Sequence, residues 1–235
     1  MYRKTLRLVA KPGRNMLKHL PIIYKLLLIL IIPSALSGHL IFKLYHNSEA
    51  QVAAQKDINK VIELTQLLNN VAHNFAVERG LSAGFIGSGG SGGNKVLLEQ
   101  RSKADAAAKQ FLSAKGKLNS LALNKHSLET IVALEDLFKQ RDIIRKKVDA
   151  LASDSGFFNY YSSINANAIT LTEKLSVYIT EPSLSAKYKA SIQLIWLKEH
   201  LGQVRGALNG IFAKGDYSYD KGKVVNDYLN KITSR

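Results

Sequence analysis

The chain has 235 residues, a formal net charge of +15 and no cysteine. This length allows one or two domains with a real core, and the missing thiols exclude disulfides, zinc–thiolate centres and cysteine nucleophiles. A basic chain suits a small anion, an anionic lipid surface or a nucleic acid. Seven of the positive charges stand in the first 25 residues, which contain no acid: Arg3, Lys4, Arg7, Lys11, Arg14, Lys18 and Lys25.

The N-terminal region divides into a basic tail, residues 1–19, and an apolar segment, residues 20–45. Leu26 to Phe42 covers 17 residues without Asp, Glu, Lys or Arg, close to the ~20 that cross a bilayer as a helix. A cleaved signal peptide is the alternative, but its apolar region would be only about 7–15 residues long. We therefore expect an uncleaved transmembrane anchor, and the membrane rather than a nucleic acid as partner.

The positive flank predicts the sidedness of this anchor. The N-terminus is expected in the cytoplasm, and residues from about 46 on the outside, which is the periplasm for a bacterial inner-membrane protein. Residues 46–235 then form an extracytoplasmic domain, which ends in the middle of a helical pattern, so we expect the domain to be truncated at Arg235.

A long helix is predicted from Asn47 to the glycine-rich stretch 87–94, which reads as a flexible loop. Apolar residues recur along this helix at steps of three and four, as in a coiled-coil seam. They are Val61, Leu64, Leu68, Val71 and Phe75, and the next seam positions are Glu78, Ser82 and Phe85. A carboxylate and a hydroxyl thus enter an otherwise apolar stripe.

Further helices are predicted over about 95–121, 127–151, 158–179 and 184–213, with Gly215 as a stop and a sixth helix from about Val224. The helix over 184–213 has an apolar stripe that we expect to face the core: Leu194, Leu197, Leu201, Val204, Leu208 and Ile211. Because no strand signal competes, the predicted fold class is all-α: a transmembrane helix continuing into an antiparallel helical bundle.

Two arginine motifs stand on different predicted helices. Arg79 and Arg205 both begin the pattern Arg-Gly-x-x-x-Gly-x-(Ile/Phe). A guanidinium offers five donors in a planar fork that matches oxyanions, and an apolar setting strengthens its attraction for an anion. We expect the two arginines to converge on one small anion, with Ser82 and Asn209, each one turn away, as neutral donors.

The adjacent residues Glu78 and Arg79 allow an alternative interpretation, in which they form a structural ion pair. The small residues beside the motifs would then only permit close helix packing.

Other candidate sites are weaker. His73, His126 and His200 lack metal-ligand spacing, and the glycine-rich run lacks the Lys-Ser/Thr of a phosphate loop. No catalytic grouping is visible, so no catalytic residue, metal or cofactor is expected in this region.

The first motif, from Glu78 to Gly87 and followed by Arg101 and Asp105, resembles the nitrate- and nitrite-sensing (NIT) domain, and the stretch Lys198 to Asn209 is similar to its second arginine motif. The resemblance covers roughly residues 50–235. It implies two stacked four-helix bundles, and nitrate or nitrite bound at Arg79 and Arg205. Arg101 also matches the pattern, and Glu78 would position an arginine.

These expectations together describe the input domain of a bacterial transmembrane signalling protein, such as a chemoreceptor. It would bind nitrate or nitrite, act as a homodimer and pass a helix shift across the membrane to an output module beyond Arg235. The alternative is a helical bundle without a ligand that mediates dimerisation or another protein contact.

Overall fold

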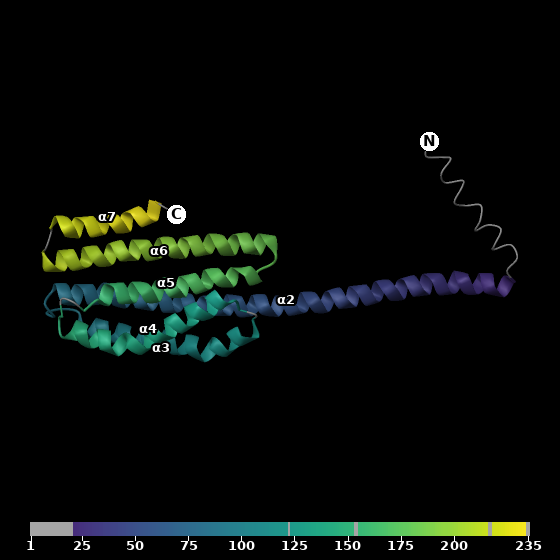
Figure 1. Cartoon of the computed structure of the whole chain (residues 1–235), viewed down its shortest axis with the longest axis horizontal. Helices are drawn as coiled ribbons and strands as arrows, with labels where there is room; N and C mark the ends of the chain where they lie inside the picture. Colours follow the sequence, from purple (N-terminus) through teal and green to yellow (C-terminus); the bar gives the residue numbers. More distant parts are fainter. Residues whose placement is uncertain (1–20, 122, 153–154, 216–217, 234–235) are drawn as a thin grey trace, which may run out of the picture. The chain divides into compact units, whose positions relative to one another are not determined.

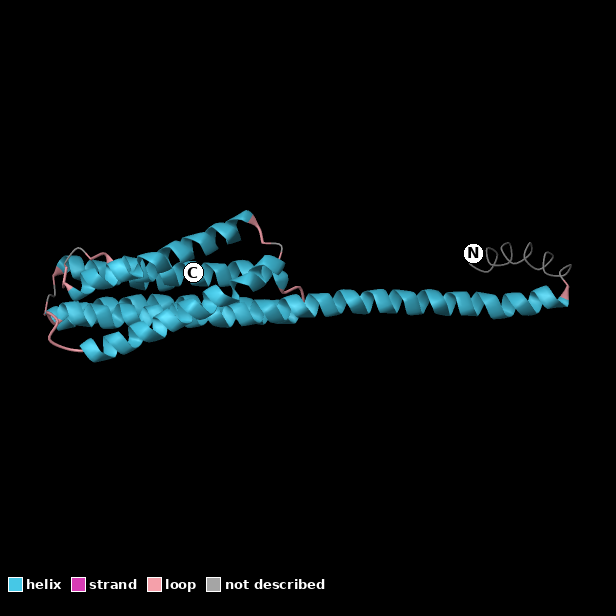
Figure 2. Ribbon diagram, turned by 90° about the horizontal axis from the view of Figure 1, so that it is seen from below, coloured by secondary structure: helices cyan, strands magenta, loops and turns pink. Residues whose placement is uncertain are grey.

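The computed structural model describes residues 21–121, 123–152, 155–215 and 218–233. The chain divides into two compact units, Met1–Gln55 and Lys56–Arg235. Every regular element in the described residues is a helix (Figure 2). The predicted all-α fold class is therefore confirmed, whereas the basic tail predicted for residues 1–19 lies outside the described residues.

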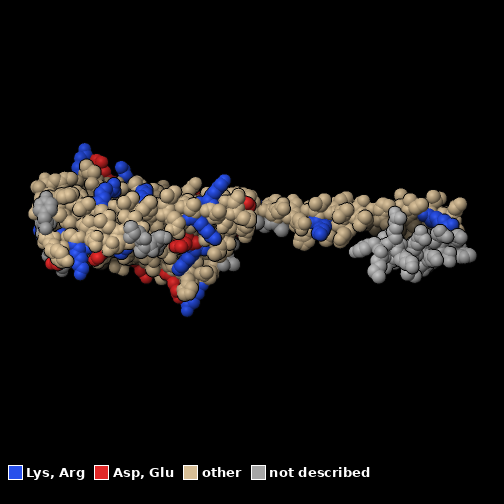
Figure 3. All heavy atoms as spheres, turned by 90° about the horizontal axis from the view of Figure 1, so that it is seen from above, with Lys and Arg blue, Asp and Glu red and all other residues tan. Residues whose placement is uncertain are grey.

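The first unit contains the apolar start of helix α2 (Ile22–Gly87). Within Ile22–Glu49, the most apolar 18-residue window has a mean hydropathy of 1.9, and none of this window is buried within the protein. In Figure 3 this part of the chain carries few charged side chains, unlike the second unit. By length and composition it could span a membrane, as expected for the anchor at residues 20–45. The domain limits and the sidedness remain predictions.

The predicted seam of α2 is confirmed in the second unit. Its five apolar positions from Val61 to Phe75 are completely buried, and Glu78, Ser82 and Phe85 continue the same buried face. Since a helix repeats every 3.6 residues, this spacing keeps one face of α2 against its neighbours for seven turns. The seam thus fixes which side of α2 faces the core.

Three helices join α2 in a first four-helix group (Figure 1). They are α3 (Asn94–Ala114), α4 (Lys125–Asp149) and α5 (Phe157–Leu175), with 3₁₀ turns at Lys115–Ser120 and Ser176–Tyr178. The Asn124 side chain caps α4 by accepting a hydrogen bond from the Ser127 N–H at 2.9 Å. In the shared core, Phe138 stacks on Phe75 and contacts Phe111 edge to face.

Helices α6 (Pro182–Lys214) and α7 (Tyr219–Thr233) complete a second group with α2 and α5. Thr65 on α2 and Tyr188 on α6 share a buried hydrogen bond of 2.5 Å. The rings of Phe158 on α5 and Tyr228 on α7 lie 5.7 Å apart. The two groups share α2 and α5, in keeping with the pair of four-helix bundles that the resemblance implies.

The predicted core face of α6 is wrong for its first three positions, whereas Val204, Leu208 and Ile211 are half-buried. Leu194, Leu197 and Leu201 are 66%, 39% and 51% exposed. The buried face carries mainly aromatic and polar residues: Tyr188, Ile192, Trp196, Glu199, His200, Gln203 and Gly206. Apolar periodicity misplaced this face because Glu199 and Gln203 face a buried cation, described below, which no pattern within α6 reveals.

The packing of α4 gives a stability prediction with a matched control on the same helix. Leu134→Ala removes a side chain with no exposure, whereas Leu128→Ala truncates one that is 51% exposed. We expect Leu134→Ala to lower the free energy of unfolding by about 2–5 kcal/mol because it leaves a cavity. Leu128→Ala should change it by about 0.5 kcal/mol or less. Urea unfolding of the full chain in detergent, followed by circular dichroism, measures both, and equal losses would contradict the core described here.

Candidate functional site

Arg79 lies on α2 with no exposure to solvent, inside the second helix group. Its Nη1 donates to Glu199 Oε1 at 2.5 Å and to Ser162 Oγ at 2.8 Å, and its Nη2 donates to Glu199 Oε2 at 3.3 Å. The Phe158 ring covers the guanidinium, 5.1 Å from its Cζ, a distance within the range of a cation–π contact. Arg79 is therefore a desolvated cation whose charge is balanced by one carboxylate.

The Glu199 carboxylate collects further donors from two helices. Asn165 Nδ2 donates to Oε2 at 2.8 Å, and Gln203 Nε2 donates to Oε1 at 2.9 Å. Each carboxylate oxygen therefore accepts two hydrogen bonds, one from Arg79 and one from an amide. Such full hydrogen bonding is what makes a buried ion pair tolerable.

Two glycines of α6 let the helix backbone approach Arg79. A Cβ added at Gly202 would lie 3.2 Å from Arg79 Nη2, and one at Gly206 would lie 3.9 Å from Arg79 Nε and 3.0 Å from the Phe158 ring. Arg79 Nε has no hydrogen-bond partner among the described residues. The small residues of the second motif thus make room for the arginine of the first motif.

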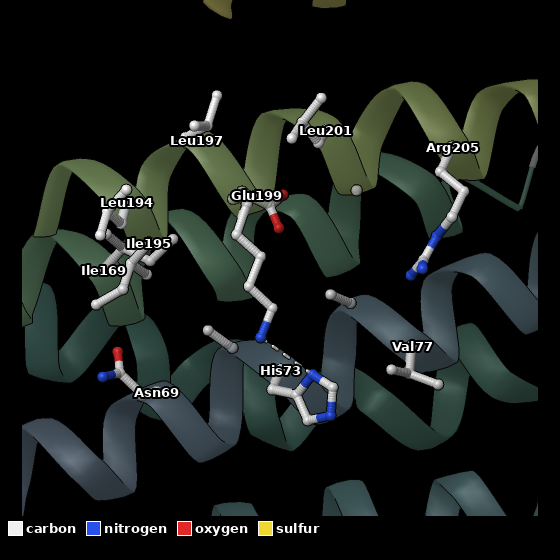
Figure 4. Close-up of a pocket in the computed structure, with 14 residues that line it drawn as sticks. Asn69, His73, Val77, Ile169, Leu194, Ile195, Leu197, Glu199, Leu201 and Arg205 are labelled. Carbon is white, nitrogen blue, oxygen red and sulfur yellow. Dashed lines mark hydrogen bonds between the residues drawn. The ribbon is translucent and has the colours of Figure 1, made fainter. Parts of the chain in front are cut away.

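A groove of about 560 Å³ runs between α2 and α6 on the outer side of this ion pair. Figure 4 shows Arg205 extending from α6 towards α2, with His73 and Val77 opposite. Lys198 also lines the groove, 3.5 Å from His73 Nδ1. Glu199 and Gly202 form part of the wall, so the groove borders the residue that holds Arg79.

The charges around this groove are mostly positive. Partial burial, followed by the charges of Lys198 and Arg205, holds the pKa of His73 below its ordinary value. Arg205 is exposed and makes no ion pair with a described residue. A cationic rim over apolar walls is an environment that attracts an anion.

The two motif arginines therefore do not lie side by side in the structure. Arg79 is buried beneath Gly202, and Arg205 stands at the groove beyond it. The Ser82 hydroxyl is buried without a described partner. Asn209 instead donates to the Gly80 carbonyl at 3.0 Å and so ties α6 to α2.

Glu78 and Arg101 lie in the first helix group, in a separate ion network. Glu78 accepts two hydrogen bonds from Arg145 at 2.8 and 2.9 Å and one from the Tyr161 hydroxyl at 2.6 Å. Arg101 pairs with Asp149 at 2.8 and 3.0 Å and stands 3.6 Å from Glu78. Neither residue contacts Arg79 through its side chain in the described interactions.

Arg145 is the centre of this network, since its Nη1 also bonds both oxygens of Asp105 at 2.9 Å. Burial lowers the pKa of Arg145, but the hydrogen bonds and charges of Glu78 and Asp105 raise it above its ordinary value overall. Burial, and then the Glu78 charge, raise the pKa of Tyr161, so its hydroxyl remains a donor to that carboxylate. Each charged side chain named in this network, among the described residues, has an oppositely charged partner.

Comparison with known proteins bears on both motifs. A family model described as nitrate and nitrite sensing (NIT) matches residues 70–229, a span that contains Arg79, Arg205 and their partners. The chain belongs to the NIT family. The resemblance seen in the two motifs is confirmed, and the matched region is a sensory domain.

One solved structure, the NasR transcription antiterminator, shares the NIT fold with a TM-score of 0.69 and 19% sequence identity. The match covers 78% of this chain and 51% of the NasR chain. This chain therefore spans about half the length of NasR, and at this identity the likeness shows the fold alone. No curated protein sequence matches.

Sequence reasoning missed Glu199 as the partner of Arg79, along with Asn165 and Gln203. One signal was present within the NIT match: Glu199, Gly202, Gln203 and Gly206 recur at steps of three and four, so they share one face of α6. That face is polar and small, and therefore unsuited to a core without a buried charge to meet. Asn165 and Arg145 gave no comparable signal.

The Glu78 network should contribute to stability rather than to ligand recognition in this NIT domain. Glu78→Gln removes the buried carboxylate that bonds Arg145 and leaves this cation with the more exposed acids Asp105 and Asp142, and we expect a loss of about 3–5 kcal/mol in the free energy of unfolding. Asp149→Asn breaks a pair whose acid side chain is 52% exposed and should cost about 1 kcal/mol or less. Urea unfolding of the full chain distinguishes them, and a larger loss for Asp149→Asn would refute this ranking.

Proposed function

We propose that this chain is the input domain of a bacterial transmembrane signalling protein, and that it binds nitrate or nitrite in the region of Arg79 and Arg205. The observation that carries the proposal is the position of the two motif arginines on opposite sides of Gly202, within a stretch that matches a nitrate- and nitrite-sensing family. An anion entering the groove meets Arg205 first and then the wall behind which Arg79 is held.

The electrostatics of the groove support an anionic ligand. Lys198 and Arg205 provide fixed positive charge, while the one acid in the wall, Glu199, is already paired with Arg79. The apolar walls lower the local dielectric and strengthen the attraction for an entering anion. Nitrate is planar and small, and so suits the guanidinium fork.

Close contacts between α2 and α6 provide a route for the signal. A Cβ at Gly84 would meet the Asn209 amide at 2.8 Å, and one at Gly87 would meet Ala213 at 2.7 Å. A ligand that changes the spacing of α2 and α6 must therefore repack this contact, which shifts the population between two helix packings. Because α2 continues to Ile22, a shift or rotation of α2 would reach the apolar segment.

Ligand binding is tested by isothermal titration of the full chain in detergent with nitrate and with nitrite. We expect heat for at least one anion, and a dissociation constant at least about tenfold weaker for Arg205→Ala, since a charge-assisted contact contributes about 1.5–3 kcal/mol. Lys189→Ala is the control, because it removes an exposed cation from α6 outside the groove. Unchanged affinity in Arg205→Ala, or no heat in either the wild type or a variant without the charge of Glu199, would refute the assigned site.

His73 should report anion binding through its proton. Its lowered pKa arises from burial and from Lys198 and Arg205, so a bound anion that offsets those charges should raise it. Binding then takes up protons, and nitrate affinity should increase as the pH falls through the ordinary histidine range. Without ligand, the same lowered pKa makes the fold less stable as the pH falls, because the unfolded chain binds that proton more tightly.

Titrations between pH 5.5 and 7.5, together with the histidine NMR signals, measure this linkage. The His73→Gln variant should lose the pH dependence but keep nitrate binding. An affinity that falls with decreasing pH in the wild type would contradict the arrangement of charges around the groove.

A protein-interaction module is the second candidate, and it rests on the exposed leucines of α6. Leu194, Leu197 and Leu201 form an apolar strip along the groove, as at many protein contacts. In this case the chain would dimerise or bind a partner without any anion. Sedimentation of wild type and Leu197→Asp with and without nitrate separates the two candidates: an association that Leu197→Asp abolishes and that nitrate leaves unchanged favours the module.

A further inference from the structure

The carboxylate of Glu199 occupies a site built for an anion. Four N–H groups from three helices meet on it: two from Arg79, one from Asn165 and one from Gln203. A carboxylate and a nitrate ion are both planar, with oxygens at similar angles around a central atom. The donors that hold the Glu199 carboxylate would therefore hold a free planar oxyanion equally well.

Glu199 differs from Glu78, the other deeply buried acid of α2 and α6. Glu78 has no exposure to solvent and is enclosed by Arg145 and Tyr161 in the first helix group. Glu199 is 4% exposed and forms part of the groove wall, together with Lys198 and Arg205. Its side chain can leave Arg79 and still find cations at the groove.

We propose that Glu199 is an internal surrogate for the ligand: it occupies the anion site of the free domain, and a small planar oxyanion displaces it. The incoming ion takes the hydrogen bonds of Arg79, Asn165 and Gln203, and the Glu199 carboxylate turns towards Lys198 and Arg205. This inference rests on the proposed function, and it adds Asn165 and Gln203 as ligand donors.

The exchange gives each motif arginine a separate role. Arg79 holds an anion in both states, first Glu199 and then the ligand, so it is never left as an uncompensated buried cation. Arg205 has no described ion-pair partner in the free state and gains one when Glu199 is released. The two arginines are therefore coupled through the Glu199 carboxylate, which changes partner. Because Glu199 belongs to α6, the exchange moves a negative charge of α6 relative to α2.

The affinity of Glu199→Gln for nitrate tests the surrogate. A site that its own side chain fills is open for only a fraction of the time, and the apparent dissociation constant is the intrinsic value divided by that fraction. Removing the charge of Glu199 should therefore tighten nitrate binding by about tenfold or more. Asp149→Asn is the matched control, since it deprives another arginine, Arg101, of its carboxylate and should leave nitrate affinity unchanged.

Glu199→Ala tests the shape of the site. It should lower the melting temperature of the full chain in detergent, and formate or nitrate should restore it by several degrees more than equal concentrations of chloride or sulfate. The same salts are applied to Asp149→Asn to subtract general salt effects. Equal rescue by chloride would mean that only charge matters, and would overturn the assignment of a planar oxyanion site.

The outcomes separate this inference from the proposed function. If wild type binds nitrate and Glu199→Gln binds it no more tightly, the surrogate is wrong while the sensor remains. If wild type shows no binding but Glu199→Gln does, the surrogate is supported. If neither protein binds nitrate or nitrite, the proposed function fails and this inference fails with it.

Discussion

The buried contact between Arg79 and Glu199 is the interaction around which the second helix group is arranged. Two charges removed from water cost several kcal/mol each, and they are tolerated only with close pairing and further hydrogen bonds. Asn165 and Ser162 on α5 and Gln203 on α6 provide these bonds. These polar side chains, together with Gly202 and Gly206, accommodate the guanidinium of Arg79.

Adjacent positions on α2 serve the two helix groups separately. Glu78 and Arg79 are about 100° apart around the helix, so one points to Arg145 in the first group and the other to Glu199 in the second. Both are fully buried. A rotation of α2 about its axis would therefore disturb both ion networks at once, so the two networks together fix the orientation of this helix.

The groove between α2 and α6 lies beside the ion pair of Arg79 and Glu199. Lys198 and Arg205 stand at its rim, and its opening leaves the leucines of α6 exposed. A sensor needs such a partly open region, since a ligand can shift a population only if it contacts the two packings differently.

The sequence by itself determined the helical class, the apolar segment near the N-terminus, the helix limits to within a few residues and the two arginine motifs that identify the family. These features are local: a period of 3.6, a run of apolar residues and a glycine after a helix can be recognised without knowing the neighbours. The seam of α2 from Val61 to Phe85 was predicted in full for this reason.

Only the tertiary structure decided which acid meets which arginine. Glu199 is 120 residues from Arg79 and Glu78 is 67 from Arg145, and the adjacent pair Glu78-Arg79 separates into two different helix groups. The same limit placed the leucines of α6 on the wrong face, because an apolar stripe is not the buried face when a helix must present polar groups to a buried cation. Local periodicity describes one helix at a time, whereas the burial of a charge is settled by the helices that surround it.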